Sequence, residues 1–111
     1  MITKKIIYYR LENVTFVLLL LTIYPSYGSW LNLLIFYLLP DISALGFIFS
    51  KKIGEFSYNL THTLILPTII LIFSINSHYL ISLIIIWYLH IYIDRILGWN
   101  LFPRNKNRQL N

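Results

Sequence analysis

The stretch YLISLIIIWYLHIYIDRILGWNLF, at residues 79–102, decides the kind of fold that this chain adopts. It is an apolar run broken by few polar side chains, and an α-helix needs roughly 20 such residues to cross the hydrocarbon core of a bilayer. Three further runs of comparable length precede it, at residues 6–24, 30–49 and 53–75. Together they predict an all-α integral membrane protein with four helices in a single transmembrane domain, residues 1–111.

The composition of the whole chain agrees with this interpretation. Of its 111 residues, 58% are hydrophobic and only 12% are charged, and the mean hydropathy is +0.68. A soluble domain typically carries about 25% charged residues, so a water-soluble fold is not expected. The net charge of +5 lies at the ends of the apolar runs, which predicts the lipid bilayer as a partner and no nucleic acid. Because cysteine is absent, disulfides and thiolate metal sites are excluded.

The short separators between the runs predict the topology. Since they span only residues 25–29, 50–52 and 76–78, consecutive helices should be antiparallel neighbours in an up-down-up-down four-helix bundle. Lysine and arginine flank the runs in the N-terminal segment, at Lys51 and Lys52, and in the tail, whereas the first and third separators carry neither. The positive-inside rule then places both termini in the cytoplasm of a bacterial inner membrane, with residues 103–111 as a basic cytoplasmic tail. This topology is compatible with assembly of the protein into a homo-oligomer.

The acidic residues are the feature of the sequence that bears most on function. The chain has only four, and all lie within or at the edge of an apolar run: Glu12, Asp41, Glu55 and Asp94. A carboxylate at the centre of a membrane helix costs about 2.5–3.5 kcal/mol on insertion scales. We therefore expect these side chains to face the interior of the bundle and to have partners there.

Helical spacing brings polar side chains onto common faces. Residues at i, i+3, i+4 and i+7 of the third run share one face: Glu55, Tyr58, Asn59 and His62. On the fourth run, His90 and Asp94 are four residues apart and also share a face. At a rise of 1.5 Å per residue, His62 and His90 both lie about 13 Å from the cytoplasmic ends of their helices, and Asp41 about 15 Å. These levels predict one polar pocket open to the cytoplasm.

Two prolines lie close to this pocket in the sequence. Pro40, directly before Asp41, is expected to kink the second helix and to leave a backbone carbonyl free near the carboxylate. Pro67 lies five residues after His62 and has the same capacity. A packing role for both prolines is the alternative.

Four motifs, taken in order, resemble those of a family of short bacterial integral membrane proteins without an assigned activity: Arg10-Leu-Glu12, Pro40-Asp41, YNLTHT at residues 58–63 and HIYIDRILG at residues 90–98. More distantly, the order Pro-Asp, Thr-His-Thr and His-x-x-x-Asp is similar to that of bacterial membrane-bound metal-dependent hydrolases. This second resemblance implies that the metal ligands are Asp41, His62, His90 and Asp94. The chain departs from the hydrolase pattern at residues 42–44 and 57–58, where a second acidic residue and a His-Arg pair are usual.

The residues support three hypotheses. In the first, the four ligands hold one divalent ion such as zinc, manganese or iron, and the protein hydrolyses a lipid or other amphiphile. Glu12 or Glu55 would then transfer a proton, and Asn59 or Arg95 would stabilise a developing oxyanion. In the second, the same residues relay protons or bind a small cation or solute. In the third, they form a buried polar network that holds a scaffold protein together.

Overall fold

The computed structural model describes residues 4–99 and 101–102, and all regular structure in that part of the chain is helical. The elements are α1 (Lys4–Ile23), η1 (Tyr24–Ser26), α2 (Trp30–Phe36), η2 (Leu39–Ile48), α3 (Lys51–His62), α4 (Ile65–Phe73) and α5 (His78–Leu97), where η marks a 3₁₀-helix. The all-helical class is therefore confirmed. The predicted basic tail, residues 103–111, lies outside the described residues.

Three helical stretches are long and apolar enough to cross a membrane, namely Lys4–Ser26, Trp30–Ile48 and His78–Leu97. The fourth predicted run, residues 53–75, is divided between α3 and α4, whose axes differ in direction by 52°. The described residues thus contain three spans, or four if the bent pair counts as one. The four-helix bundle and its orientation in the membrane remain predictions.

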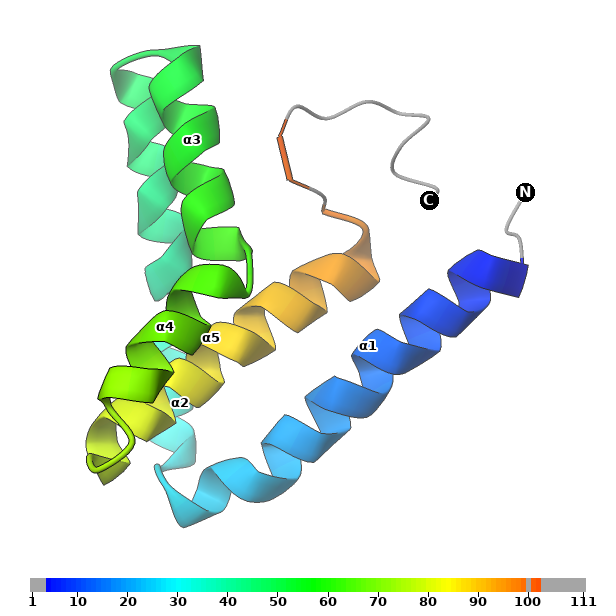
Figure 1. Ribbon diagram of the computed structural model, residues 1–111, viewed down its shortest axis with the longest axis vertical. Helices are drawn as coiled ribbons and strands as arrows, with labels where there is room; N and C mark the ends of the chain where they lie inside the picture. The colour runs from blue at the N-terminus through cyan, green and yellow to red at the C-terminus, as the bar shows by residue number, and fades with distance from the viewer. Residues whose placement is uncertain (1–3, 100, 103–111) are drawn as a thin grey trace.

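Figure 1 shows how the helices are arranged. α1 and α5 lie side by side and run in opposite directions, whereas η2 packs along α3 as the second arm of a tight hairpin. The α1–α2 and α4–α5 connections lie at the lower side of the view, and the turn between η2 and α3 lies at the upper side. α5 contacts α1, α2, η2 and α4, so it is the central helix of the fold.

The core is small and lies along α5. Tyr24 is fully buried against Ile86 and Leu89 of α5, and its hydroxyl donates a 2.7 Å hydrogen bond to the carbonyl of Ser29. Most other large apolar side chains are exposed along the helices. That distribution suits helices surrounded by lipid, because lipid tails are as apolar as the side chains that they contact.

The hairpin of η2 and α3 is held together by polar contacts and by glycine. Ser50 caps α3 by accepting a 3.1 Å hydrogen bond from the backbone N–H of Ile53, and the Ser57 hydroxyl donates to the Ser43 carbonyl at 2.7 Å. At Gly46 an added Cβ would collide with the hydroxyl of Ser57 and lie 3.1 Å from the carbonyl oxygen of Ile53, so glycine allows the two backbones to approach closely. This packing places the start of η2 opposite the end of α3.

Candidate metal centre

Pro67 determines where α3 ends. A proline ring collides with the carbonyl four residues earlier, and here that residue, Thr63, is extended, with φ −95° and ψ 161°. α3 therefore stops at His62, which becomes its last residue. The break also frees the carbonyl of Thr61 from helical hydrogen bonding, and the indole Nε1 of Trp87 donates to it at 2.6 Å.

Pro40 has a parallel effect in the neighbouring segment. Pro40 has no backbone N–H. The N–H of Asp41 donates a 3.0 Å hydrogen bond to the carbonyl of Leu38, three residues earlier, and not to the carbonyl four residues earlier as in an α-helix. The carbonyl of Tyr37 is thereby available, and Nδ1 of His90 donates to it at 2.7 Å. The segment that follows, η2, is an unusually long 3₁₀-helix, because such helices rarely exceed three or four residues.

The second histidine is oriented in the same way as the first. Nδ1 of His62 donates to the carbonyl of Tyr58 at 2.8 Å, and the two rings stack with their centroids 3.8 Å apart. Both imidazoles therefore use Nδ1 on a backbone carbonyl and direct Nε2 to the other side. A hydrogen bond from one ring nitrogen to a carbonyl, which fixes the other as the ligand atom, is the usual support of a metal-binding histidine.

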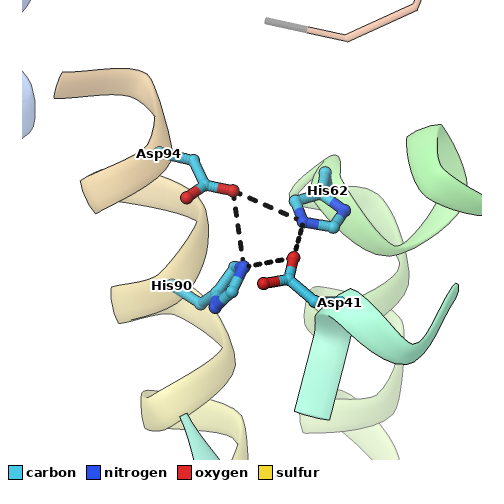
Figure 2. A group of neighbouring side chains, drawn as sticks. All are labelled: Asp41, His62, His90 and Asp94. Carbon is cyan, nitrogen blue, oxygen red and sulfur yellow. Dashed lines mark hydrogen bonds and ion pairs between the residues drawn. The ribbon is translucent and has the colours of Figure 1, made fainter. Parts of the chain in front are cut away.

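The two Nε2 atoms face two carboxylates (Figure 2). Nε2 of His90 lies 3.0 Å from Oδ1 of Asp41 and 3.4 Å from Oδ2 of Asp94. Nε2 of His62 lies 3.3 Å and 3.4 Å from the same two oxygen atoms. One ligand atom from each residue falls within 4.8 Å of all the others. The structure thus brings together all four residues that the sequence predicts as metal ligands.

Three of the four side chains are almost completely buried. The exposed fractions are 3% for His62, 1% for His90 and 9% for Asp94, whereas Asp41 is 42% exposed. Oδ2 of Asp94 is buried and has no hydrogen-bond donor among the described residues. A buried carboxylate oxygen without a donor is costly, and a cation beside it would offset that cost.

The spacing of the four atoms suits a transition-metal ion. If zinc–nitrogen and zinc–oxygen bonds are about 2.0–2.1 Å, neighbouring ligand atoms in a regular tetrahedron lie about 3.3–3.4 Å apart. The four histidine–aspartate separations, 3.0–3.4 Å, are close to that value, and the two remaining pairs, His62 with His90 and Asp41 with Asp94, lie within 4.8 Å. With neutral imidazoles, the two carboxylates carry a charge of −2, which a divalent ion would neutralise.

The residues predicted to assist catalysis lie outside this cluster. The side-chain amide of Asn59 donates to the carbonyl of Phe102 at 2.6 Å and accepts from its N–H at 2.7 Å, which fastens the segment after α5 to α3. Arg95 is exposed, with its guanidinium 5.6 Å from the ring centroid of Tyr92. Glu12 is exposed on α1, and Glu55 is half-buried on α3. Their catalytic roles remain predictions.

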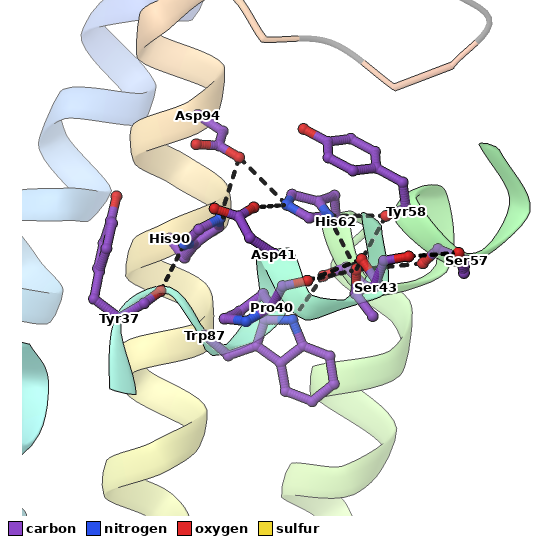
Figure 3. A network of polar contacts seen from close by, with 11 residues as sticks. Tyr37, Pro40, Asp41, Ser43, Ser57, Tyr58, His62, Trp87, His90 and Asp94 are labelled. Carbon is purple, nitrogen blue, oxygen red and sulfur yellow. Dashed lines mark hydrogen bonds and ion pairs between the residues drawn. The ribbon is translucent and has the colours of Figure 1, made fainter. Parts of the chain in front are cut away.

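Several supporting residues were not identified from the sequence, among them Tyr37 and Ser43 (Figure 3). Thr61 is the centre of this group, because its hydroxyl lies 2.8 Å from that of Ser43 and 3.0 Å from Nδ1 of His62. The carbonyl of Tyr37 is the other contributor. The only sequence signal for it was Pro40, three residues later, because a proline leaves an earlier carbonyl without its helical donor.

One comparison with known proteins gives a match. A family model described as "Domain of unknown function (DUF4260)" matches residues 6–108, nearly the whole chain. No curated protein and no solved structure matches. The match agrees with the predicted resemblance to a family without an assigned activity, and it does not bear on the more distant resemblance to metal-dependent hydrolases.

Proposed function

We propose that this chain, which belongs to the DUF4260 family, is a membrane protein that binds one divalent transition-metal ion through Asp41, His62, His90 and Asp94. The observation that carries this proposal is the convergence of four ligand atoms, with both imidazoles oriented by backbone carbonyls through Nδ1. Two nitrogen and two oxygen ligands suit zinc, manganese or iron.

Metal content tests this proposal directly. Wild-type protein, His62→Ala and His90→Ala would be purified in detergent without a metal-affinity column and analysed by mass spectrometry. The matched control is His78→Ala, because His78 lies on α5 with His90 but is exposed and outside the cluster. We expect about one ion per chain in wild type and His78→Ala, and none in the other two variants, with helical circular dichroism retained in all four.

A metal-free wild-type protein, even after supplementation with zinc, manganese and iron, would contradict the proposal. The cluster would then be held by protons shared between the histidines and aspartates. In that case the proton-relay and scaffold hypotheses would stand, and proton-flux measurements in vesicles would separate them.

The exposure of Asp41 favours a catalytic ion over a purely structural one. Structural zinc sites are closed on all sides, whereas catalytic sites keep an open position. Here Asp41, whose side chain is 42% exposed, is the ligand that water would displace, which would leave three protein ligands and one open position. A divalent ion at such a position activates water, so the activity we propose is hydrolysis of a membrane-associated ester, with the open side toward the cytoplasm.

Hydrolysis of a chromogenic phosphodiester by the metal-loaded protein tests this activity. Turnover should be lost in His62→Ala and after chelation, and it should be retained in His78→Ala. Glu55→Gln should keep its metal and lose about 10²–10⁴-fold in kcat if Glu55 transfers the proton. Turnover that is equal in wild type and His62→Ala would refute metal-dependent hydrolysis.

A further inference from the structure

An apolar hollow of about 300 Å³ lies next to the metal centre, between α2, α4 and α5. Its wall includes these residues: Leu39, Pro40, Thr61, Ile70, Leu83 and Trp87. Of these side chains, only Thr61 and Trp87 carry polar atoms, and the Trp87 Nε1 is already bonded to the Thr61 carbonyl. The hollow therefore offers almost no hydrogen-bonding groups to a polar ligand.

The hollow and the cluster have a common wall. Pro40 precedes the ligand Asp41, and the hydroxyl of Thr61 lies 3.0 Å from Nδ1 of His62. Figure 3 shows Pro40 and Trp87 below Asp41 and His62, with Asp94 above them in the view. None of the four ligands lines the hollow itself, so a molecule seated in it would reach them past Pro40, which directly precedes Asp41.

The same prolines that build the centre also account for the hollow. The break before Pro67 turns α4 by 52° away from the direction of α3, so α4 does not continue the close packing that α3 makes along η2. Pro40 is the second residue of η2, directly after the interruption between α2 and η2. The hollow forms where these segments diverge above α5.

We propose that this hollow holds the alkyl chain of an amphiphile whose anionic, oxygen-bearing head binds at the metal centre. The inference rests on the proposed metal site and specifies its ligand class. The apolar lining favours an alkyl chain as the ligand, because burial of apolar surface is the main favourable interaction that this lining offers. The half-exposed Asp41 is the ligand at which a head group gains access, because the other three ligands are buried.

The test uses cobalt-loaded protein in phosphatidylcholine nanodiscs, titrated with ethylphosphonate or octylphosphonate. Binding of the head is read from the change in the visible absorption of cobalt. Leu83→Trp fills the hollow from α5, and Ile70→Trp fills it from α4. Ile93→Trp is the matched control, because Ile93 lies on α5 but lines a different groove. All variants meet the same partitioning of octylphosphonate into the bilayer.

We expect octylphosphonate to bind at least tenfold more weakly to both hollow-filling variants than to wild type or Ile93→Trp. Ethylphosphonate should bind all four proteins equally. A tenfold difference is a modest expectation for octylphosphonate, because each methylene that the hollow buries raises the affinity about fourfold.

Equal octylphosphonate affinity in all four proteins, with cobalt bound, would overturn this inference alone. Failure of the wild-type protein to bind cobalt, zinc, manganese or iron would overturn the proposed function and this inference together. Because metal content is measured on the same samples, the two failures are distinguishable.

Discussion

Replacement of Pro40 should separate the stability of the helix from the affinity for metal. In Pro40→Ala, residue 40 regains a backbone N–H, and the segment can continue as an α-helix in which the N–H of Asp41 reaches the Tyr37 carbonyl. That carbonyl now orients His90 through a 2.7 Å bond. Loss of a supporting hydrogen bond to a histidine ligand typically weakens metal binding by 10–100-fold, or about 1.4–2.7 kcal/mol.

The stability of the metal-free protein should change in the opposite direction. Proline is about 3 kcal/mol less favourable than alanine inside a helix, and this value is an upper limit here because Pro40 lies at the start of η2. We therefore expect the metal-free variant to unfold at the same or a higher temperature than wild type, while its zinc affinity falls. The opposite signs distinguish a local effect on His90 from general damage to the fold.

Competition with a chelator would give the zinc affinity, and thermal unfolding in the presence of EDTA would give the stability. Pro25→Ala is the matched control, because Pro25, like Pro40, is the second residue of a 3₁₀-helix, here η1, but lies outside the metal centre. Its zinc affinity should equal that of wild type. If Pro40→Ala binds zinc as tightly as Pro25→Ala, the freed carbonyl does not orient His90 and the reasoning is wrong.

Three further predictions concern the hairpin, the C-terminal segment and the topology. Gly46→Ala should lower the free energy of unfolding by about 1–3 kcal/mol, because its Cβ would lie 3.1 Å from a carbonyl oxygen of α3; unchanged thermal unfolding would contradict this. Asn59→Ala should cost about 1–3 kcal/mol through the lost bonds to Phe102 and leave the metal content intact, whereas loss of metal would show that Asn59 acts on the centre. In this cysteine-free chain, Lys51→Cys should react with an impermeant maleimide only in inverted vesicles and His78→Cys only in right-side-out ones; labelling from the same side would refute the predicted topology.

The ligand set was accessible from the sequence through helical spacing, depth and a family resemblance. His90 and Asp94 share a helical face by their spacing, and this α-helix is regular from His78 to Leu97. His62 and Asp41 belong to other segments, and their similar predicted depth in the membrane, together with the resemblance to metal-dependent hydrolases, linked them to that face. The structure supports this reasoning, because the ligand atoms of all four residues lie within 4.8 Å of one another.

The interruptions in the helices were harder to predict. In the run at residues 53–75, the break between α3 and α4 follows His62 directly, within the polar motif at residues 58–63, but polar residues also occur inside regular helices and proline is tolerated in many membrane helices. Likewise, the contact between Asn59 and Phe102 joins residues 43 apart in sequence. No periodic pattern reports such a pairing, since it depends on the direction in which the chain leaves α5. The role of Asn59 proposed from its helical face did not include this contact.

The unsatisfied oxygen of Asp94 favours an ion over shared protons. Two doubly protonated histidines beside two aspartates would also be neutral overall, so charge alone does not decide between the two states. Each Nε2 is within hydrogen-bonding distance of Oδ1 of Asp41, at 3.0 Å for His90 and 3.3 Å for His62, and lies 3.4 Å from Oδ2 of Asp94. A single N–H proton aligns well with only one acceptor, and Oδ2 of Asp94 indeed receives no hydrogen bond from the described residues. A central cation contacts all four atoms at once, so it accounts for the arrangement of both carboxylates, including the one that protons would leave unsatisfied.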